Sequence, residues 1–203
     1  ARADGVRATT IDAVTAGIDA TVPGCVHTDL LAAGLIPDPY LDRNENQLRW
    51  IGRGDWRYTT TFTWHPGEED RTDLVCEGLD TVARVELNGV EVARTQNMHR
   101  SYRWSVRSLL RPGDNELTVT FDSPDAYAAA QRDRLGDLPG PNSATPEPFN
   151  FIRKMACNFG WDWGPVLTTS GIWKPIRLHS WSSARLARVR PLVTVDDGAG
   201  HVR

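Results

Sequence analysis

The sequence has few cysteines, few lysines and no long hydrophobic run, and each shortage excludes a class of protein. The three cysteines lie far apart and form no CxxC pair, so we expect neither a zinc ribbon nor a disulfide scaffold. No hydrophobic run approaches the roughly 18 residues of a membrane-spanning helix, so we expect no membrane partner. Acidic residues (26) outnumber basic ones (23), which argues against nucleic acid as a partner.

The length excludes a further class of protein. The chain has 203 residues, whereas a complete (β/α)₈ barrel needs roughly 250, so a whole barrel enzyme does not fit. Hydrophobic residues make up 40% and charged residues 24%, which is ordinary for a folded globular domain. The five histidines never fall at the spacing of metal ligands, so we predict no structural metal.

The cysteines bear on the compartment. Cys25, Cys76 and Cys157 are odd in number and far apart, so we expect three small buried thiols in a reducing compartment, which favours the cytoplasm. The sequence starts at Ala1 without an initiator methionine, so a leader peptide could have been removed, and the localisation stays open.

Alternation with a period of two dominates the chain. From Trp56 to Trp64 one face carries mainly aromatic residues and the other Arg and Thr, which predicts a half-buried strand. Asn88-Gly89 separates two alternating runs between residues 83 and 93, and this dipeptide is the strongest short-range signal for a β-hairpin. Further strands are expected at 73–76, 102–106, 117–121, 172–181 and 185–195.

Two helical segments interrupt the strands. They are expected at 25–33 and at 124–135, where Ser123 can serve as N-cap ahead of Pro124. Residues 138–149 contain four prolines and predict an irregular exposed loop. Many short strands with frequent turns predict an all-β fold, namely a jelly-roll antiparallel β-sandwich with one or two short helices.

The C-terminal end indicates a second unit. Alternation over 185–195 is followed by the turn signal Asp196-Asp197-Gly198, and the sequence stops five residues later. We expect the partner strand of this hairpin to be missing, as in a chain that has been cut. The predicted domains are therefore a jelly roll at 1–182 and, at 183–203, the first strand and turn of a following, truncated sandwich.

The motif Trp161-Asp162-Trp163, followed by Gly164 and Pro165, is the main candidate for chemistry. An indole stacks on the C–H face of a sugar, and a carboxylate between two indoles can accept hydrogen bonds from sugar hydroxyls. The alternative is that an Asp in a Gly-rich loop only caps a turn, and spacing alone leaves both open.

Neighbouring residues have simpler interpretations. Trp56, Trp64 and Trp104 lie on strand faces, where core packing is favoured over ligand binding. Arg153 and Lys154, upstream of the motif, could pair with the Asp162 carboxylate or a substrate oxygen, and the plainer alternative is a solvated basic pair.

Three long segments carry a family resemblance from residue 22 to residue 181. They are VPGCVHTDLLAAGLIPDPYLDRNENQLRWIGRGDWRYTTTF at 22–62, EGLDTVARVELNGVEVARTQNMHRSYRWSV at 77–106 and FNFIRKMACNFGWDWGPVLTTSGIWKPIRL at 149–178. Each resembles the opening domain of the β-mannosidases of glycoside hydrolase family 2. One departure is Pro175, which stands where many members have Asp after the GIW-basic segment.

The resemblance implies a domain order and a reaction. Members begin with a galactose-binding-domain-like jelly roll, followed by an immunoglobulin-like sandwich and a (β/α)₈ barrel. The reaction is retaining hydrolysis of terminal non-reducing β-mannosides by two Glu on the barrel, which lie roughly 5–5.5 Å apart. The resemblance implies no metal and no organic cofactor for this chemistry. Neither catalytic Glu is expected on this chain, so it should be inactive alone and need the barrel of its own full-length chain as partner. The Asn44-Glu45 dipeptide is assigned a structural role.

The resemblance also implies the residues that bind substrate. Asp162 becomes a ligand of the sugar hydroxyls in the −1 subsite, Trp161 a wall of the pocket, and Trp163 and Arg153 further binding residues. The alternatives are a stand-alone carbohydrate-binding module for mannose or manno-oligosaccharides, a purely structural sandwich, and the same domain of a β-galactosidase, β-glucuronidase or exo-β-glucosaminidase.

Overall fold

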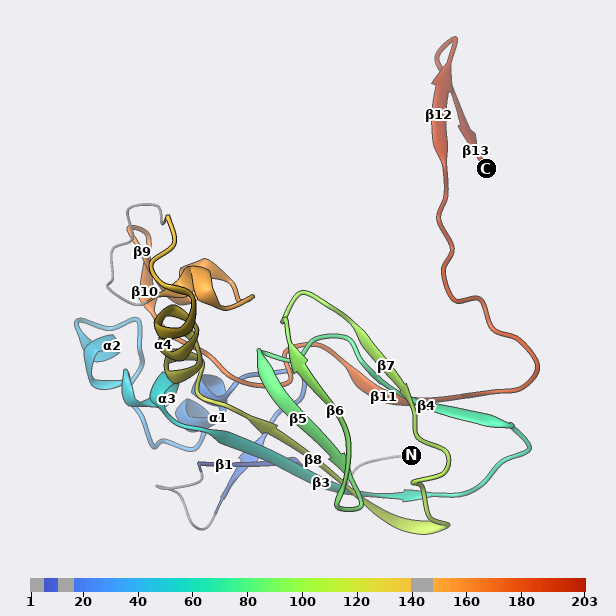
Figure 1. Cartoon of the computed structure of the whole chain (residues 1–203), viewed down its shortest axis with the longest axis horizontal. Helices are drawn as coiled ribbons and strands as arrows, with labels where there is room; N and C mark the ends of the chain where they lie inside the picture. Colours follow the sequence, from blue (N-terminus) through green and yellow to red (C-terminus); the bar gives the residue numbers. More distant parts are fainter. Residues whose placement is uncertain (1–5, 11–16, 140–147) are drawn as a thin grey trace.

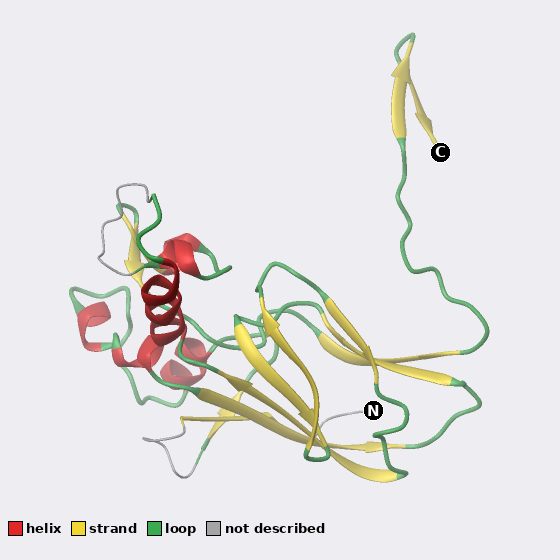
Figure 2. Ribbon diagram, in the orientation of Figure 1, coloured by secondary structure: helices red, strands yellow, loops and turns green. Residues whose placement is uncertain are grey.

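Two antiparallel sheets packed face to face form the body of the molecule (Figures 1 and 2). The computed structural model describes residues 6–10, 17–139 and 148–203. The larger sheet contains, in spatial order, β2 (Ile18–Ala20), β1 (Val6–Thr10), β3 (Trp56–Trp64), β8 (Gly113–Phe121), β5 (Val82–Leu87) and β6 (Val90–Gln96). The smaller sheet contains β11 (Ile176–Trp181), β4 (Arg71–Cys76) and β7 (Tyr102–Ser105). The predicted all-β sandwich is confirmed.

The core lies between the sheets and follows the alternation of the sequence. In β3 the side chains of Trp56, Tyr58 and Phe62 are buried, while Arg57 and Thr61 on the opposite face are exposed. All nine residues of β3 pair with β8, so the two strands form the centre of the larger sheet. The Trp56 indole is fully buried and its Nε1 donates to the Ile51 carbonyl at 2.9 Å, which confirms the core-packing interpretation. Trp64 and Trp104 are partly buried against the same core.

The hairpin expected around Asn88-Gly89 is present. Leu87 pairs with Val90, so Asn88 and Gly89 form a tight two-residue turn between β5 and β6. Asn88 has φ 53° and Gly89 φ 79°, the left-handed conformations that such a turn requires and that these two residue types tolerate. A register shift between Val85 and Glu86 is a detail that the alternation did not predict.

The helices gather at one end of the sandwich (Figure 2). They are α1 (Val26–Ala32), α2 (Asn44–Gln47), α3 (Trp50–Arg53) and α4 (Pro124–Leu135). The predicted bounds of α4 are correct, and the Ser123 hydroxyl accepts from the Ala126 N–H at 3.1 Å as an N-cap. The same hydroxyl donates to the Gly52 carbonyl, which joins α4 to α3. Helices α2 and α3 were not predicted because a single turn shows no periodicity. Most of the predicted loop at 138–149 lies outside the described residues.

The C-terminal segment differs from its prediction in the length of its first strand and in the presence of a second. A strand forms only at β12 (Val193–Asp196), so the strand predicted from residue 185 is too long. The partner strand expected to be missing is present as β13 (Ala199–Val202), and the hairpin turns at Asp197 (φ 46°) and Gly198 (φ 77°). Figure 1 shows this hairpin far from the sandwich, at the end of an extended segment. Alternation over 185–192 forms no strand because no described neighbouring strand pairs with it.

The cysteines agree only in part with the expectation of buried thiols. All three are free, but only Cys76 is buried, and burial raises the pKa of its thiol to about 12. Cys25 and Cys157 are half-buried, so the expectation is wrong for them. Across the described residues, no group of three His, Cys, Asp or Glu side chains could hold a metal ion. No helix in the same part of the chain is long and apolar enough to cross a membrane.

Candidate functional site: the Trp161–Trp163 hairpin

The candidate motif forms a tight β-hairpin, where the sequence predicted a loop. Strands β9 (Phe159–Trp161) and β10 (Gly164–Val166) pair so that Trp161 faces Gly164, which leaves Asp162 and Trp163 as a two-residue turn. The Trp161 side chain is 40% exposed and the Trp163 side chain 72% exposed. Asp162 is exposed between them. The sequence thus places two indoles and a carboxylate at one projecting point, which we call the WDW tip.

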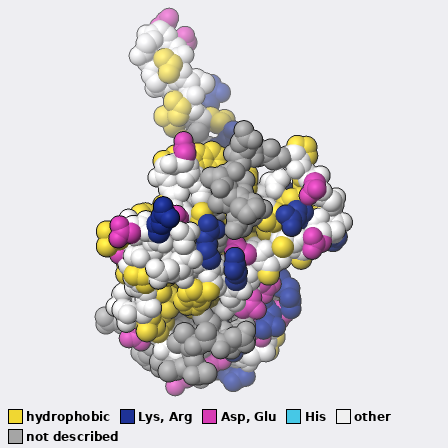
Figure 3. Space-filling model, turned by 90° about the vertical axis from the view of Figure 1, so that its left-hand side faces the viewer, with side chains coloured by type: hydrophobic (Ala, Val, Ile, Leu, Met, Phe, Trp, Pro, Cys, Tyr) yellow, Lys and Arg dark blue, Asp and Glu magenta, His cyan; other side chains and the backbone are white. Residues whose placement is uncertain are grey.

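The tip lies at the helical end of the molecule. In Figure 1 the β9–β10 hairpin stands beside α2 and α4, and Figure 3 looks onto this end. Hydrophobic side chains are exposed there among Lys and Arg side chains. Within the described residues, the Asp162 carboxylate has no hydrogen-bond or ion-pair partner. An exposed carboxylate without a partner keeps its oxygens free to accept from a ligand.

The base of the hairpin is buried, in contrast to its tip. Phe159 is 1% exposed and packs in a small apolar cluster with Val82, Ala128 and Ile152. Its ring lies 6.4 Å from that of Phe149, centroid to centroid. Side-chain packing therefore fixes the first residue of β9 to the sandwich.

A carboxylate from a distant segment holds the second strand. The Val166 N–H donates to Oε2 of Glu45 at 2.5 Å, which links β10 to α2. Beside it, the Asn44 Nδ2 donates to the Asp38 carbonyl at 2.9 Å. These contacts agree with the structural role assigned to Asn44-Glu45.

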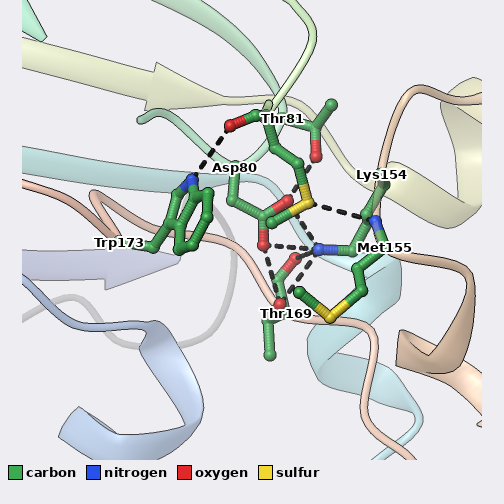
Figure 4. Close-up of polar contacts among 7 residues, drawn as sticks. Asp80, Thr81, Lys154, Met155, Thr169 and Trp173 are labelled. Carbon is green, nitrogen blue, oxygen red and sulfur yellow. Dashed lines mark hydrogen bonds and ion pairs between the residues drawn. The ribbon is translucent and has the colours of Figure 1, made fainter. Parts of the chain in front are cut away.

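A buried lysine joins the two ends of the segment that carries the hairpin. Lys154 is fully buried, and its Nζ lies 2.6 Å from Asp80 Oδ1, with Oδ2 also in contact (Figure 4). The same Nζ donates to the Thr169 carbonyl at 2.8 Å and contacts the Thr169 hydroxyl at 2.9 Å. We call Asp80, Lys154 and Thr169 the lysine cluster. A solvated Lys154, or one paired with Asp162, is therefore wrong.

The remaining acceptor sites of the Asp80 carboxylate are also filled. The Thr169 hydroxyl donates to Oδ2 at 2.7 Å, and the Thr81 hydroxyl donates to Oδ1. Burial lowers the pKa of Lys154, and the Asp80 charge acts in the opposite direction. Removing one partner of such a pair is costly because it leaves an uncompensated buried charge.

His27 is a third buried ionisable group close to this pair. Burial, and next the charge of Lys154, lower the pKa of its imidazole to about 4. Its Nδ1 is buried without a hydrogen-bond partner in the described part of the chain. The imidazole is therefore neutral at physiological pH.

Arg153, the fourth candidate, lies in a different setting. Its side chain is exposed and lines a hollow together with Asn97, Arg100, Tyr102 and Tyr127. No hydrogen bond or ion pair between described residues joins it to Asp162. The structure groups three of the four predicted residues and leaves Arg153 without a contact to them.

Sequence reasoning missed the residues that hold the hairpin. Asp80 and Lys154 are 74 residues apart, and Glu45 and Val166 are 121 residues apart, so no local motif joins them. One signal was available: of the 23 basic residues only two are lysines. A lysine in such a chain fits a site that needs a compact point charge instead of a planar guanidinium.

The antiparallel sandwich belongs to the class of galactose-binding-like domains. A family model described as "Glycosyl hydrolase 2 galactose-binding domain-like" matches residues 6–174, and the chain belongs to this family. It is 39% identical to a β-mannosidase of Capra hircus over 177 residues, which cover 83% of this chain and 20% of that protein. It is 37% identical to β-mannosidase B of Thermothelomyces thermophilus, over 86% of this chain and 20% of that protein.

Solved structures agree. The crystal structure of a β-D-mannosidase from Dictyoglomus thermophilum matches with a TM-score of 0.84 at 34% identity, over 99% of this chain and 25% of that one. The exo-chitosanase of Amycolatopsis orientalis matches with a TM-score of 0.70 at 15% identity, over 95% and 22% of the two chains, which shows the fold alone. The chain spans about a fifth of the length of the curated relatives it matches.

Proposed function

We propose that this chain is the N-terminal sugar-binding domain of a retaining exo-β-mannosidase, which removes terminal non-reducing β-D-mannose residues. Curated relatives named β-mannosidase reach 39% identity over most of the chain. Structures of glucosaminidases and glucuronidases in the comparison reach only 15–20% identity. This difference favours mannose over the other sugars.

The unpartnered, exposed Asp162 between two exposed indoles is the observation that carries the proposal. Its carboxylate accepts hydrogen bonds from sugar hydroxyls in the −1 subsite, and Trp161 forms a wall of the pocket. Trp163, at 72% exposure, offers a further stacking surface. In this proposal Arg153, which lines the hollow with Asn97 and Tyr102, donates to a sugar oxygen.

In this proposal the chain supplies binding and no proton transfer. Retaining hydrolysis needs two carboxyl groups on either side of the scissile bond. Glu45 belongs to the Asn44-Glu45 dipeptide, which matches the Asn-Glu pattern of the family's acid/base residue. Its carboxylate accepts a hydrogen bond from the Val166 N–H. The nucleophile and the acid/base lie on a barrel domain outside this chain, which is its partner.

Residues 183–203 belong to a second domain in this proposal. Val193, Val195 and Val202 share one face of the β12–β13 hairpin, and each is at least 63% exposed. Such a face is normally buried against a second sheet. We propose that it begins an immunoglobulin-like sandwich, whereas residues 1–182 form the jelly roll.

The first experiment compares substrates. The full-length protein that contains this chain is assayed with nitrophenyl β-mannoside, β-galactoside, β-glucuronide and β-glucosaminide. We expect the mannoside to have the highest kcat/KM and the isolated chain to release no nitrophenol. A different preferred sugar, or hydrolysis by residues 1–203 alone at an enzymatic rate, would contradict the proposal.

The second experiment tests Asp162 directly. Charge-assisted hydrogen bonds contribute about 1.5–3 kcal/mol, so Asp162→Asn should lower kcat/KM for the mannoside roughly ten- to a hundredfold. The matched control is Asp197→Asn, which changes an exposed Asp in the two-residue turn of the β12–β13 hairpin and should leave kcat/KM unchanged. Equal values for wild type and Asp162→Asn would favour a purely structural sandwich.

A third measurement separates this proposal from a stand-alone binding module. Mannose and manno-oligosaccharides are titrated into residues 1–203. We expect very weak binding because one hairpin supplies only part of a subsite. Tight binding that is lost in Asp162→Ala would favour the module.

A further inference from the structure

We infer that Lys154 is a positioning residue: with Asp80 and Thr169 it closes the base of the segment that carries the WDW tip and so fixes where the tip stands. The inference deepens the proposed function, on which its link to sugar binding rests. The mechanical part, that the lysine cluster holds the hairpin, rests on contacts within this chain alone.

The first step is the closure of the segment. Lys154 lies seven residues before Trp161, and Thr169 lies six residues after Trp163. One ammonium group binds both the carbonyl and the hydroxyl of Thr169, at 2.8 and 2.9 Å, so the two ends of the segment are joined. Figure 4 shows the Lys154 ammonium between Asp80 and Thr169. Strands β9 and β10 lie in the sequence between the two joined residues.

The second step is the attachment of the junction to the sandwich. Asp80 stands between β4 and β5, and its backbone pairs with Gly171 in both directions, at 2.9 and 3.1 Å. Gly171 has φ +153°, and a Cβ there would lie 2.8 Å from the Cys25 Cα, so this close approach requires glycine. Asp80 therefore connects the junction to rigid strands through both its carboxylate and its backbone.

A second contact secures the leading end. The Met98 N–H donates to the Arg153 carbonyl at 3.1 Å, and the Met155 N–H lies 3.1 Å from the Met98 sulfur. The Trp173 Nε1 donates to the Met98 carbonyl at 3.2 Å. The residues on both sides of Lys154 are thus fixed, which points its side chain into the cluster.

The third step concerns the choice of lysine. The ammonium has three donors in a compact group, and in the structure they meet a carboxylate, a carbonyl and a hydroxyl. A guanidinium is planar and larger and does not match this arrangement. A buried ion pair is weak evidence for stability, but it specifies one arrangement among several, and here that arrangement sets the tip.

The test is amide hydrogen exchange on residues 1–203. Two variants weaken the cluster: Lys154→Met removes the charge, and Thr169→Val removes only a hydroxyl while keeping the side-chain shape. The matched control is Lys174→Met, which removes the other lysine of the chain, whose ammonium lies over the Trp173 ring. Exchange at residues 159–166 is compared with exchange in β3 and β8.

We expect Thr169→Val to lose about tenfold or more of its protection at 159–166, with β3 and β8 unchanged. Lys154→Met should lose protection at 159–166 and, through its lower global stability, in β3 and β8 as well. Lys174→Met should exchange like the wild type. Unchanged protection at 159–166 in Thr169→Val would overturn the inference, and so would an equal loss across the whole chain in that variant. If Lys154→Met fails to fold, Thr169→Val still decides.

The same variants separate this inference from the proposed function. In the full-length protein, Thr169→Val should raise KM or lower kcat for the β-mannoside without changing the unfolding midpoint by more than the control does. Local loss of protection with no β-mannosidase activity in the wild type would leave the inference standing and remove the proposed function. Normal protection at 159–166 in Thr169→Val, together with β-mannosidase activity in the wild type, would remove the inference and leave the proposed function standing.

Discussion

Two members of the lysine cluster, Lys154 and Thr169, lie on the same short segment as the WDW tip, and cluster and tip differ in almost every physical respect. Lys154 is fully buried, and its ammonium meets oxygens of both Asp80 and Thr169. Asp162, eight residues later, is exposed and has no partner among the described residues. In our proposal the difference separates two tasks: buried, hydrogen-bonded charges fix the segment, and an exposed carboxylate without a protein partner accepts from a ligand.

The two hairpins whose two-residue turns carry an Asp give a second contrast. The β9–β10 hairpin is held at its base by Phe159 and through Glu45, whereas the described side chains of β12 and β13 are all exposed. Both turns carry an Asp, yet only one is fixed to a sandwich. An exposed Asp becomes a candidate for binding because of what holds its backbone.

The largest effect is expected from the lysine cluster. Lys154→Met leaves the Asp80 carboxylate buried without its counter-ion, so the free energy of unfolding should fall by about 3–5 kcal/mol. Lys174→Met loses only a contact of its ammonium with the Trp173 ring and should cost less than about 1 kcal/mol. Urea unfolding followed by Trp fluorescence measures both. Equal losses of unfolding free energy in Lys154→Met and Lys174→Met would contradict the claim that the lysine cluster stabilises the chain more than Lys174 does.

A pH effect follows from His27 next to the cluster. Its pKa is about 4 in the folded chain and 6.5 as an ordinary value, so the folded state binds fewer protons between these limits. Stability should therefore fall as the pH drops from about 6.5 to about 4, by roughly 3 kcal/mol, and this contribution should not change further below pH 4.

The variant His27→Gln isolates this contribution. Urea midpoints are compared at pH 7.5 and pH 4.5 for the wild type and the variant. Other groups that titrate in this window act on both proteins, so the difference between them reports His27. A wild type that loses no more stability than the variant would contradict a buried neutral imidazole.

Glu45 should have a smaller effect, because it holds one strand through one hydrogen bond. Glu45→Gln keeps the shape and loses the charge on the acceptor of the Val166 N–H, which should cost about 1 kcal/mol of unfolding free energy. The control Glu68→Gln changes an exposed Glu in the loop between β3 and β4, and it should leave the free energy of unfolding unchanged. Thermal unfolding of the two variants side by side would show whether Glu45 is an anchor.

The smallest effect on stability is expected at the tip. Asp162→Asn and Trp163→Ala change exposed side chains, so each should alter the free energy of unfolding by no more than about 0.5 kcal/mol. Urea unfolding measures this. A loss above 1 kcal/mol in either variant would mean that the tip stabilises the fold and is not free for a ligand.

Much of the fold could be predicted because its signals are local. Strand β3 alternates over nine residues, Asn88-Gly89 specifies a turn by its own backbone preferences, and Ser123 caps α4 three residues away. The C-terminal strand was overestimated for the same reason. Alternation over 185–195 records which faces are apolar, but a strand also needs a neighbouring strand.

The candidate site was predictable only at its tip. Trp161, Asp162 and Trp163 are adjacent in sequence, so their grouping needed no tertiary structure. The contacts of Lys154 with Asp80 and of Glu45 with Val166 depend on how distant segments pack, and single-sequence reasoning assigned Lys154 to solvent or to Asp162. Candidate binding residues can be recognised from a local motif, whereas the residues that hold them in place require the fold.

A double-mutant cycle in the full-length protein tests most directly whether the cluster acts through the tip. The kcat/KM for nitrophenyl β-mannoside is measured for the wild type, Thr169→Val, Asp162→Asn and the double variant. If the cluster positions the Asp162 carboxylate, Thr169→Val should lower kcat/KM in the wild-type background and have almost no further effect once Asp162 is Asn. Equal losses from Thr169→Val in both backgrounds would contradict the account.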